Sequence, residues 1–218
     1  MTRSPPAGIH SDPASVALIE AAFPGPRGEP KRAVLAHALA CFNETGIEAS
    51  KIDDVRQRSG QSVGTIYHHF KNKEGVAAAL FFVGFDDQSQ AIAQALAKAD
   101  GEIQRMVAAL IEAYMAWTER AAGMARFLML ARDQMAQGPS GEVLIERLLA
   151  RYRPMDEQLA RAMAEGRIRK VPEDLIPALV LGPAESYCRG WLAGRRSLPP
   201  SQCSALLADA AWRSLALR

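Results

Sequence analysis

The chain has 218 residues, of which 49% are apolar and 23% are charged, and its formal net charge is +2. These are ordinary globular values, and the chain is long enough to bury a substantial core. Because the net charge is small, it neither demands nor excludes a polyanionic partner, and any basic surface has to be local.

Three widely spaced cysteines without a CxxC pair favour buried thiols over a disulfide framework. No run approaches the ~20 apolar residues that cross a bilayer, and residues 1–30 lack the order of a secretion signal. We therefore expect a cytoplasmic protein that does not enter a membrane.

Residues 1–30 contain six prolines on both sides of the short apolar piece "ASVALIEAAF". Proline and glycine at this density interrupt regular structure. The composition predicts a flexible N-terminal arm over 1–30 with one possible short helix.

From Lys31 onward, good helix formers dominate and strand-like alternation is absent, which predicts an all-α protein of about nine helices. The first helix ends at Gly46, Ser50 and Asp53 have the spacing of a capping box, and Ser62 is placed as an N-cap. The expected helices span about 31–45, 50–59, 62–70, 72–98, 101–120, 123–136, 140–165, 172–195 and 201–217.

The stretch "SGQSVGTIYHHFKNKEG" could serve three chemistries. Adjacent His68 and His69 point about 100° apart on a helix, so they cannot share a metal ion from one face. The sequence around Ser62 matches a nucleophile elbow, but a polar helical pattern precedes it instead of the buried strand that an elbow needs. We therefore expect neither a metal site nor a catalytic serine.

The third chemistry is a helix that meets nucleic acid. On a helical wheel Val63, Ile66, Tyr67 and Phe70 form the inward side, Gly64, Thr65 and His68 lie opposite, and His69 flanks them. Small hydrogen-bonding groups suit a helix in a major groove, and two helices joined by a short turn with glycine form a helix-turn-helix. We expect a three-helix DNA-binding domain over 31–76 that is joined to a larger helical domain over 77–218.

The stretch from Gly46 to Gly75 resembles the DNA-binding domain of the TetR (tetracycline-repressor-like) family of transcriptional regulators. The residues that carry the resemblance are Gly46, Ser50, Ile52, Val55, Gly60, Ser62, Gly64, Thr65, Tyr67, His69, Phe70, Lys73 and Glu74. Arg56, Ser59 and Gln61 depart from the usual Ala, Ala and Val, and a long side chain such as Arg56 has to reach outward to solvent.

The resemblance implies that the third helix reads the major groove and that the start of the fourth anchors the phosphate backbone. For His69, packing at the helix crossing stands as an alternative to DNA contact. The implied DNA-contacting residues are Ser50, Lys51, Gly64, Thr65, Tyr67, His68, His69 and Lys73.

The resemblance also implies a two-fold dimer, with ligand binding and dimerisation in the domain over 77–218. The closing helices offer bulky and small apolar residues for such an interface. The alternative is that these helices only cap the core of one subunit. Pro183 lacks an amide donor and should bend its helix. The expected interface residues are Leu179, Gly182, Gly190, Trp191, Gly194, Leu206, Leu207 and Ala210.

Methionine and aromatic side chains gather on the helices that precede the closing helices, and such surfaces suit an adaptable apolar pocket. Filling a helical core is the alternative for each of them. The candidate ligand-binding residues are Tyr114, Met115, Trp117, Met124, Phe127, Met129, Met135, Tyr152 and Tyr187.

Taken together, the sequence predicts a DNA-binding transcriptional regulator. We expect a repressor that binds a palindromic double-stranded DNA operator as a homodimer and is released by a small apolar or amphipathic effector, with no cofactor and no enzymatic activity. The alternatives are a helical enzyme, for which no catalytic constellation is visible, and a helical adaptor that does not read DNA.

Overall fold

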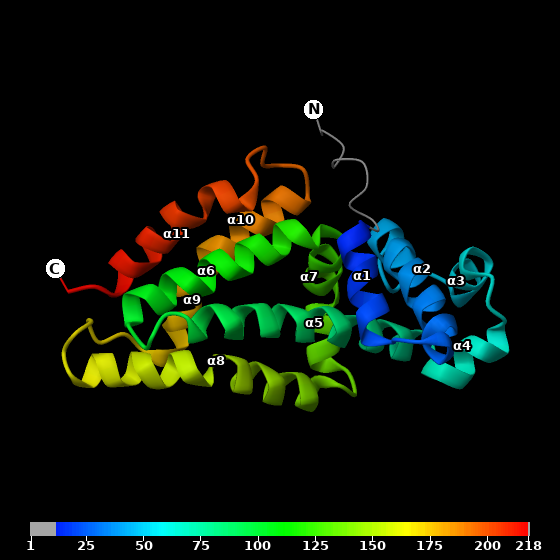
Figure 1. Cartoon of the computed structure of the whole chain (residues 1–218), viewed down its shortest axis with the longest axis horizontal. Helices are drawn as coiled ribbons and strands as arrows, with labels where there is room; N and C mark the ends of the chain where they lie inside the picture. The colour runs from blue at the N-terminus through cyan, green and yellow to red at the C-terminus, as the bar shows by residue number, and fades with distance from the viewer. Residues whose placement is uncertain (1–11, 218) are drawn as a thin grey trace. The chain divides into compact units, whose positions relative to one another are not determined.

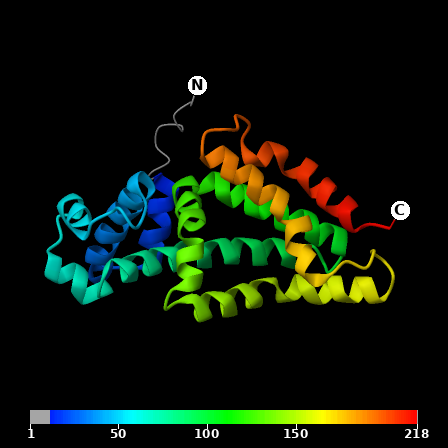
Figure 2. The ribbon, with the colours of Figure 1, turned by 180° about the vertical axis from the view of Figure 1, so that it is seen from behind.

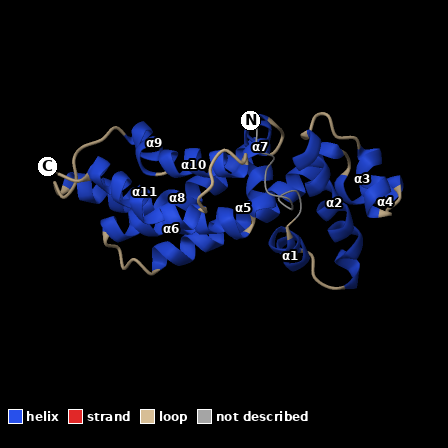
Figure 3. Cartoon of the chain, turned by 90° about the horizontal axis from the view of Figure 1, so that it is seen from above, coloured by secondary structure: helices blue, strands red, loops and turns tan. Residues whose placement is uncertain are grey.

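The computed structural model describes residues 12–217, which form α-helices, short 3-10 helices and loops (Figure 1). Within this range the only β-type pairing is an isolated bridge between Ile168 and Ala216, and Figure 3 shows helices and loops throughout. The prediction of an all-α chain is confirmed. The helices are α1 (Pro13–Ala22), η1 (Pro26–Gly28), α2 (Glu29–Thr45), α3 (Ile52–Ser59), α4 (Val63–Phe70), α5 (Lys73–Ala97), α6 (Ile103–Arg120), α7 (Ala122–Gln137), α8 (Gly141–Ala164), η2 (Glu173–Leu175), α9 (Ile176–Val180), α10 (Gly182–Leu192) and α11 (Pro200–Leu215).

The segment expected as one helix over 172–195 is broken into η2, α9 and α10. Pro183 stands in the first turn of α10, where its missing N–H costs no helical hydrogen bond. The effect of Pro183 on the helix is therefore larger than the expected bend, because a new helix starts there.

Residues 12–30 are not a flexible arm, so that prediction is wrong for this part of the segment, while residues 1–11 lie outside the described range. The short helix that the sequence allowed is α1, and it contributes the fully buried Ile19 to the core. Asp12 caps its start, and the Arg32 guanidinium donates to the carbonyl oxygens of Phe23 and Gly25 at its end, at 2.6 and 2.7 Å. These bonds offset the conformational entropy that favours disorder in a proline-rich segment.

The described residues fall into two compact units. The N-terminal unit comprises 12–87 and 120–144, and the C-terminal unit comprises 88–119 and 145–217. Helix α5 contributes to both units, and α7 belongs to the unit that holds the first helices. The expected domain boundaries at residues 30 and 76 separate functions, and they differ from the boundaries of the two compact units. The assignment of DNA binding to 31–76 and of regulation to 77–218 remains a prediction.

Helix α2 is the centre of the N-terminal unit. Its predicted apolar stripe is completely buried, and α1, α3, α4 and α7 all pack on it, as Figures 1 and 2 show from opposite sides. The short helices α1, α3 and α4 are too short to be stable alone and depend on the apolar core that they share with α2. Helix α2 therefore fixes the positions of α3 and α4. The stripe consists of Val34, Leu35, Ala38, Leu39 and Phe42.

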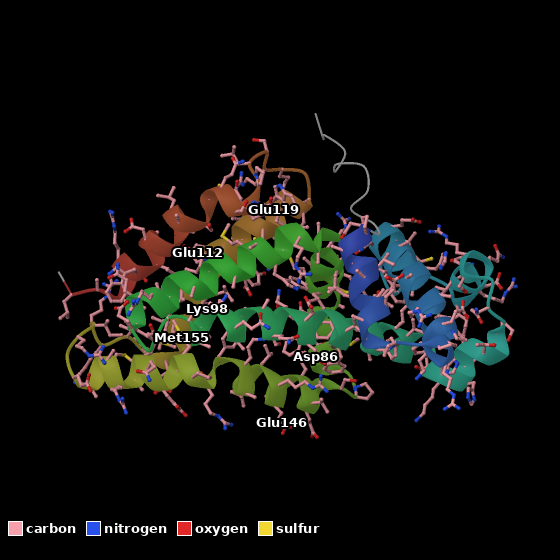
Figure 4. The ribbon with its side chains drawn as sticks, viewed as in Figure 1. Asp86, Lys98, Glu112, Glu119, Glu146 and Met155 are labelled. Carbon is pink, nitrogen blue, oxygen red and sulfur yellow. The ribbon has the colours of Figure 1, made fainter. Side chains whose placement is uncertain are left out.

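In the C-terminal unit α9, α10 and α11 pack against one another. Glu119 on α6, labelled in Figure 4, accepts a hydrogen bond from the Ser201 amide in the first turn of α11 at 2.9 Å. Arg151 of α8 donates to Gln88 Oε1 of α5 at 3.0 Å. None of the helices in the described range has both the length and the apolar character needed to cross a membrane.

Candidate nucleic-acid interface

Helices α3 and α4 form a helix-turn-helix. Gly60 ends α3 in the left-handed conformation at φ 69°, and its N–H donates to the Arg56 carbonyl at 3.0 Å. The start of α3 differs from the expected Ser50–Asp53 capping box. Lys51 is the N-cap residue, and its amide donates to Asp54 Oδ2 at 3.2 Å, because Ser50 is turned inward and Asp53 pairs with Arg56.

The start of α4 is capped as predicted. Ser62 Oγ accepts the Thr65 amide at 3.0 Å and lies 2.9 Å from the Thr65 hydroxyl. An N-cap of this kind satisfies one of the amides that have no partner within the helix. Thr65 is therefore held at a defined position in the first turn of α4.

Helix α4 buries only Ile66 and Phe70, which are 0% and 7% exposed. Tyr67 is 48% and Val63 43% exposed, so their expected place on the inward side is wrong. At 100° per residue Val63 lies about 40° and Tyr67 about 80° from the direction midway between Ile66 and Phe70, so Tyr67 stands at the flank of the helix, and Val63 is the first residue of α4. His69 is half-buried at the same angular distance as Tyr67, on the opposite flank of the helix.

The remaining residues of α4 face away from the core, as the helical wheel predicts. Gly64 and His68 are exposed and Thr65 is half-buried. This outward face is small and carries hydrogen-bonding groups, which is the kind of surface that can approach base edges in a major groove.

The junction between α4 and α5 is tight. Lys71 ends α4 with φ 67°, a left-handed conformation that is uncommon for a residue with a side chain, and its amide donates to the Tyr67 carbonyl at 2.9 Å. Asn72 Oδ1 then accepts the Gly75 amide at 2.7 Å. A Cβ atom on Gly75 would lie 1.8 Å from the Phe70 carbonyl oxygen, so glycine is needed for this approach of the two helices.

Two predicted phosphate ligands are engaged within the protein. Ser50 is buried, and its hydroxyl donates to the Gly46 carbonyl at 2.6 Å. The Lys73 ammonium donates to the carbonyl oxygens of Glu48 and Ser50 at 2.9 and 3.1 Å. An ammonium has three N–H donors, so Lys73 holds the loop between α2 and α3 and keeps one donor for another partner.

Arginines in this region are paired with carboxylates. Arg58 donates to both carboxylate oxygens of Glu44, at 2.9 and 2.8 Å, and Arg56 lies 2.6 Å from Asp53 Oδ1. The hydrogen bond from Arg56 lowers the pKa of Asp53. Arg56 reaches outward as expected for a long side chain at this helix crossing, but its charge is largely compensated.

His68 and His69 meet edge to face, with ring centroids 5.0 Å apart. Burial, followed by the nearby His68 and Lys31, lowers the pKa of His69, which favours the neutral form of this ring. Within the described range no group of three His, Cys, Asp or Glu side chains is placed to hold a metal ion.

The expected interface residues lie on α9, α10, α11 and the loop after α10, all within the C-terminal unit. Leu206 is 73% exposed and Ala210 is exposed, whereas Leu179, Gly182, Trp191, Gly194 and Leu207 are half-buried. Gly190 is covered by its own chain, because a Cβ there would lie 3.1 Å from Arg196 Cγ. Dimerisation through this surface remains a prediction.

The candidate ligand-binding residues are divided between the two units. Tyr114, Met115, Trp117, Tyr152 and Tyr187 belong to the C-terminal unit, and Met124, Phe127, Met129 and Met135 to the N-terminal unit. Tyr187 is half-buried, and its hydroxyl donates to the Leu198 carbonyl at 3.1 Å.

Two of these residues contribute to the core of the N-terminal unit. The Phe127 ring stacks on Phe42 of α2 at 5.8 Å, and Met124 packs closely over Gly84 of α5. A single pocket lined by all the candidate residues stays a prediction.

Sequence reasoning missed three features that shape this region: the Arg58–Glu44 pair, the close approach at Gly75 and the contacts of Lys73 with the loop. Arg58 and Glu44 are 14 positions apart, and Lys73 is 23 and 25 positions from its partners in the loop, so no local sequence pattern predicts these contacts. The close approach at Gly75 could have been predicted, because a glycine in the first turn of a helix is a signal for it.

Comparisons with known proteins agree with this geometry. Residues 34–80 match the family model described as bacterial regulatory proteins, tetR family. The fold is similar to that of a TetR family transcription regulator from Marinobacter aquaeolei VT8, with 16% identity, a TM-score of 0.74, and coverage of 88% of this chain and 98% of that chain.

Two further structures show the same fold. The ketosteroid transcriptional regulator KstR2 of Mycobacterium tuberculosis is 18% identical, with a TM-score of 0.71 and coverage of 86% and 95% of the two chains. The TetR family regulator PfmR from Thermus thermophilus is 22% identical, with a TM-score of 0.67 and coverage of 83% and 97%. The match of residues 34–80 to the tetR family model and the fold shared over most of the chain together support a TetR family transcriptional regulator.

Proposed function

We propose that this chain is a repressor that binds a palindromic DNA operator as a homodimer in the cytoplasm and leaves it when a small apolar or amphipathic effector binds. The observation that carries the DNA-binding part is the outward face of α4. Gly64, Thr65 and His68 form this face, and caps at both ends of the turn hold the helix in place. No catalytic role is part of this proposal.

The proposed contacts divide into two kinds. Thr65 and His68 meet base edges, and Gly64 allows the close approach of the helix to the groove. Tyr67 at the flank of α4 and Lys51 at the start of α3 meet phosphates, and both side chains are exposed. Lys73 contributes through its remaining donor, while the buried Ser50 acts only by shaping the loop.

The half-buried His69 remains the residue with two possible roles, since it packs between His68 and Phe70. In its neutral form the His69 ring can still donate one hydrogen bond to a phosphate or a base. We include it as a contact at the edge of the interface.

The exposed apolar part of α11 supports the dimer proposal. Leu206 and Ala210 are four residues apart, lie on the same face of the helix, and are both exposed. In a two-fold dimer this face meets itself, and the two recognition helices lie about 34–36 Å apart, one turn of DNA.

The test is binding of the purified protein to the DNA upstream of its own gene and to a scrambled duplex, followed by fluorescence anisotropy across a salt series. Lys51→Ala should weaken binding to both duplexes and reduce the salt dependence by about one counterion, since one phosphate contact is lost. Lys98→Ala is the matched control, because Lys98 is an exposed lysine just after the end of α5, at a site not proposed to meet DNA (Figure 4).

Thr65→Ala should reduce the preference for the upstream DNA by about five- to tenfold or more, which corresponds to the loss of one base contact. Equal loss on both duplexes would contradict the role of Thr65 in reading sequence. Absence of binding to any duplex at low salt, with wild-type protein that is folded, would contradict the proposed function.

A further inference from the structure

The first turn of α7 has no cap of its own. Ala121 occupies the N-cap position without a side chain that could accept a hydrogen bond. The amides of Gly123 and Met124 would then lack partners within the helix, as the first amides of every α-helix do.

These two amides are capped from α1, more than a hundred residues earlier in the sequence. The Gly123 amide donates to Asp12 Oδ2 at 2.7 Å, and the Met124 amide donates to Ser15 Oγ at 2.9 Å. Ser15 is completely buried, and α1 lies beside both α2 and α7 (Figures 1 and 2). A carboxylate at a helix start also interacts favourably with the helix dipole.

One carboxylate thus caps two helices. Asp12 Oδ1 accepts the Ser15 amide at 2.9 Å, and Oδ2 accepts the Ser15 hydroxyl at 2.7 Å in addition to the Gly123 amide. All three partners are donors, so both oxygens of Asp12 act only as acceptors. An asparagine at this position would turn its NH₂ group toward at least one of these donors.

The same turn of α7 is joined to α2. Asn43 Nδ2 donates to the Gly123 carbonyl at 2.9 Å in a buried position, and Phe127 stacks on Phe42 one helical turn further along. The other end of α1 is held to α2 by the hydrogen bonds of Arg32 to Phe23 and Gly25. Helix α1 is therefore bonded to α7 at its start and to α2 at its end.

We propose that α1 is a strap that fixes the first turn of α7 to α2, and that Asp12 is a positioning residue for the DNA-binding helices. Since α2 carries α3 and α4, loosening the strap changes how firmly α4 is held. The DNA part of this proposal rests on the function proposed above, whereas the connection between α1, α7 and α2 does not.

The test is hydrogen exchange of the full chain, comparing wild type with Asp12→Asn. We expect exchange about tenfold faster in both α1 and residues 122–126, and faster exchange at the end of α2 near Asn43, because a partly buried, charge-assisted cap is lost. DNA binding should weaken by about threefold or more under conditions where the protein remains folded.

Glu102→Gln is the matched control. Glu102 caps the start of α6 through the amides of Gln104 and Arg105, at 3.1 and 2.7 Å, so the variant makes the same chemical change at a cap with local partners. It should speed exchange only near residues 103–107 and leave DNA binding unchanged. Ser15→Ala, which removes the partner of the Met124 amide, provides a second variant in case Asp12→Asn does not fold.

Faster exchange confined to α1, with 122–126 and the end of α2 as protected as in wild type, would overturn the strap. Loosening of α7 with DNA binding equal to that of Glu102→Gln would overturn the positioning role. If wild type itself binds no DNA, the proposed function fails, and protection at the end of α2 still decides whether α1 holds α7 and α2 together.

Discussion

The close approach at Gly75 gives a quantitative prediction about the joint between α4 and α5. A methyl group there would lie 1.8 Å from the Phe70 carbonyl oxygen and 3.3 Å from Asn72 Oδ1. Real Cβ contacts are essentially never under 3.0 Å, so Gly75→Ala forces the carbonyl and the methyl apart by about 1.2 Å or more. The obstacle is backbone, which cannot turn aside as a flexible side chain can.

Forcing such a shift should destabilise the protein by about 1–3 kcal/mol. For a chain of this size the corresponding fall in Tm is about 2–4 °C per kcal/mol. Because Phe70 ends α4, the displacement also moves this helix, which we propose to read the DNA, and DNA binding should weaken. Urea unfolding followed by circular dichroism and DNA titration measure the two effects.

Gly64→Ala is the matched control in the neighbouring helix. Its Cβ would have Ser62 Oγ as the nearest atom, at 3.7 Å, an ordinary contact. Replacing glycine by alanine in an unobstructed helix stabilises by about 0.5–1 kcal/mol. The two substitutions should therefore change stability in opposite directions, while both weaken DNA binding if the methyl group added by Gly64→Ala meets the groove. Equal stability of Gly75→Ala and wild type would refute the steric reasoning.

Single contacts give three further predictions. Ser62→Ala removes the cap of α4 and should cost about 1 kcal/mol in urea unfolding, so an unchanged midpoint would contradict the capping role. Burial raises the pKa of Cys188 to about 12 from an ordinary 9.0, so the thiol ionises at lower pH in the unfolded chain than in the folded one. The free energy of unfolding should therefore fall as pH rises above about 9, and Cys188→Ala should flatten this dependence. Leu206→Glu should weaken self-association by about tenfold or more in sedimentation experiments, whereas Leu149→Glu, with Leu149 62% exposed on α8, should not; equal effects would place the interface elsewhere.

The sequence predicted the parts of this fold that depend on local pattern. The apolar stripe of α2, the cap at Ser62 and the turn at Gly60 follow from the spacing of residues within one or two helical turns, and the structure contains all three. The outward face of α4 also followed from its periodicity. The exposure of the flanks of α4 was not predicted, because a helical wheel does not say how wide a strip of the helix its neighbours cover. Tyr67 is for this reason more exposed than the wheel indicated.

Contacts between distant parts of the chain were not predictable in this way. The proline-rich composition of residues 1–30 indicated an arm, but the amides of Gly123 and Met124 supply partners for Asp12 and Ser15 from 111 and 109 residues away. Likewise, the resemblance implied that Lys73 meets a phosphate, and its bonds to the loop after α2 were missed because these partners are 23 and 25 residues away in sequence. Long-range hydrogen bonds of this kind decide whether a side chain is available to a ligand.

The measurement that tests the central claim most directly is selection of bound duplexes from a random DNA library by wild type and by Thr65→Ala. If α4 reads the major groove in a dimer, wild type should enrich an inverted repeat with half-sites about one turn apart, and Thr65→Ala should lose preference at one position in each half-site. Failure of wild type to enrich any sequence, or an unchanged enriched sequence with Thr65→Ala and with a matching His68→Ala variant, would contradict the assignment of α4 as the recognition helix.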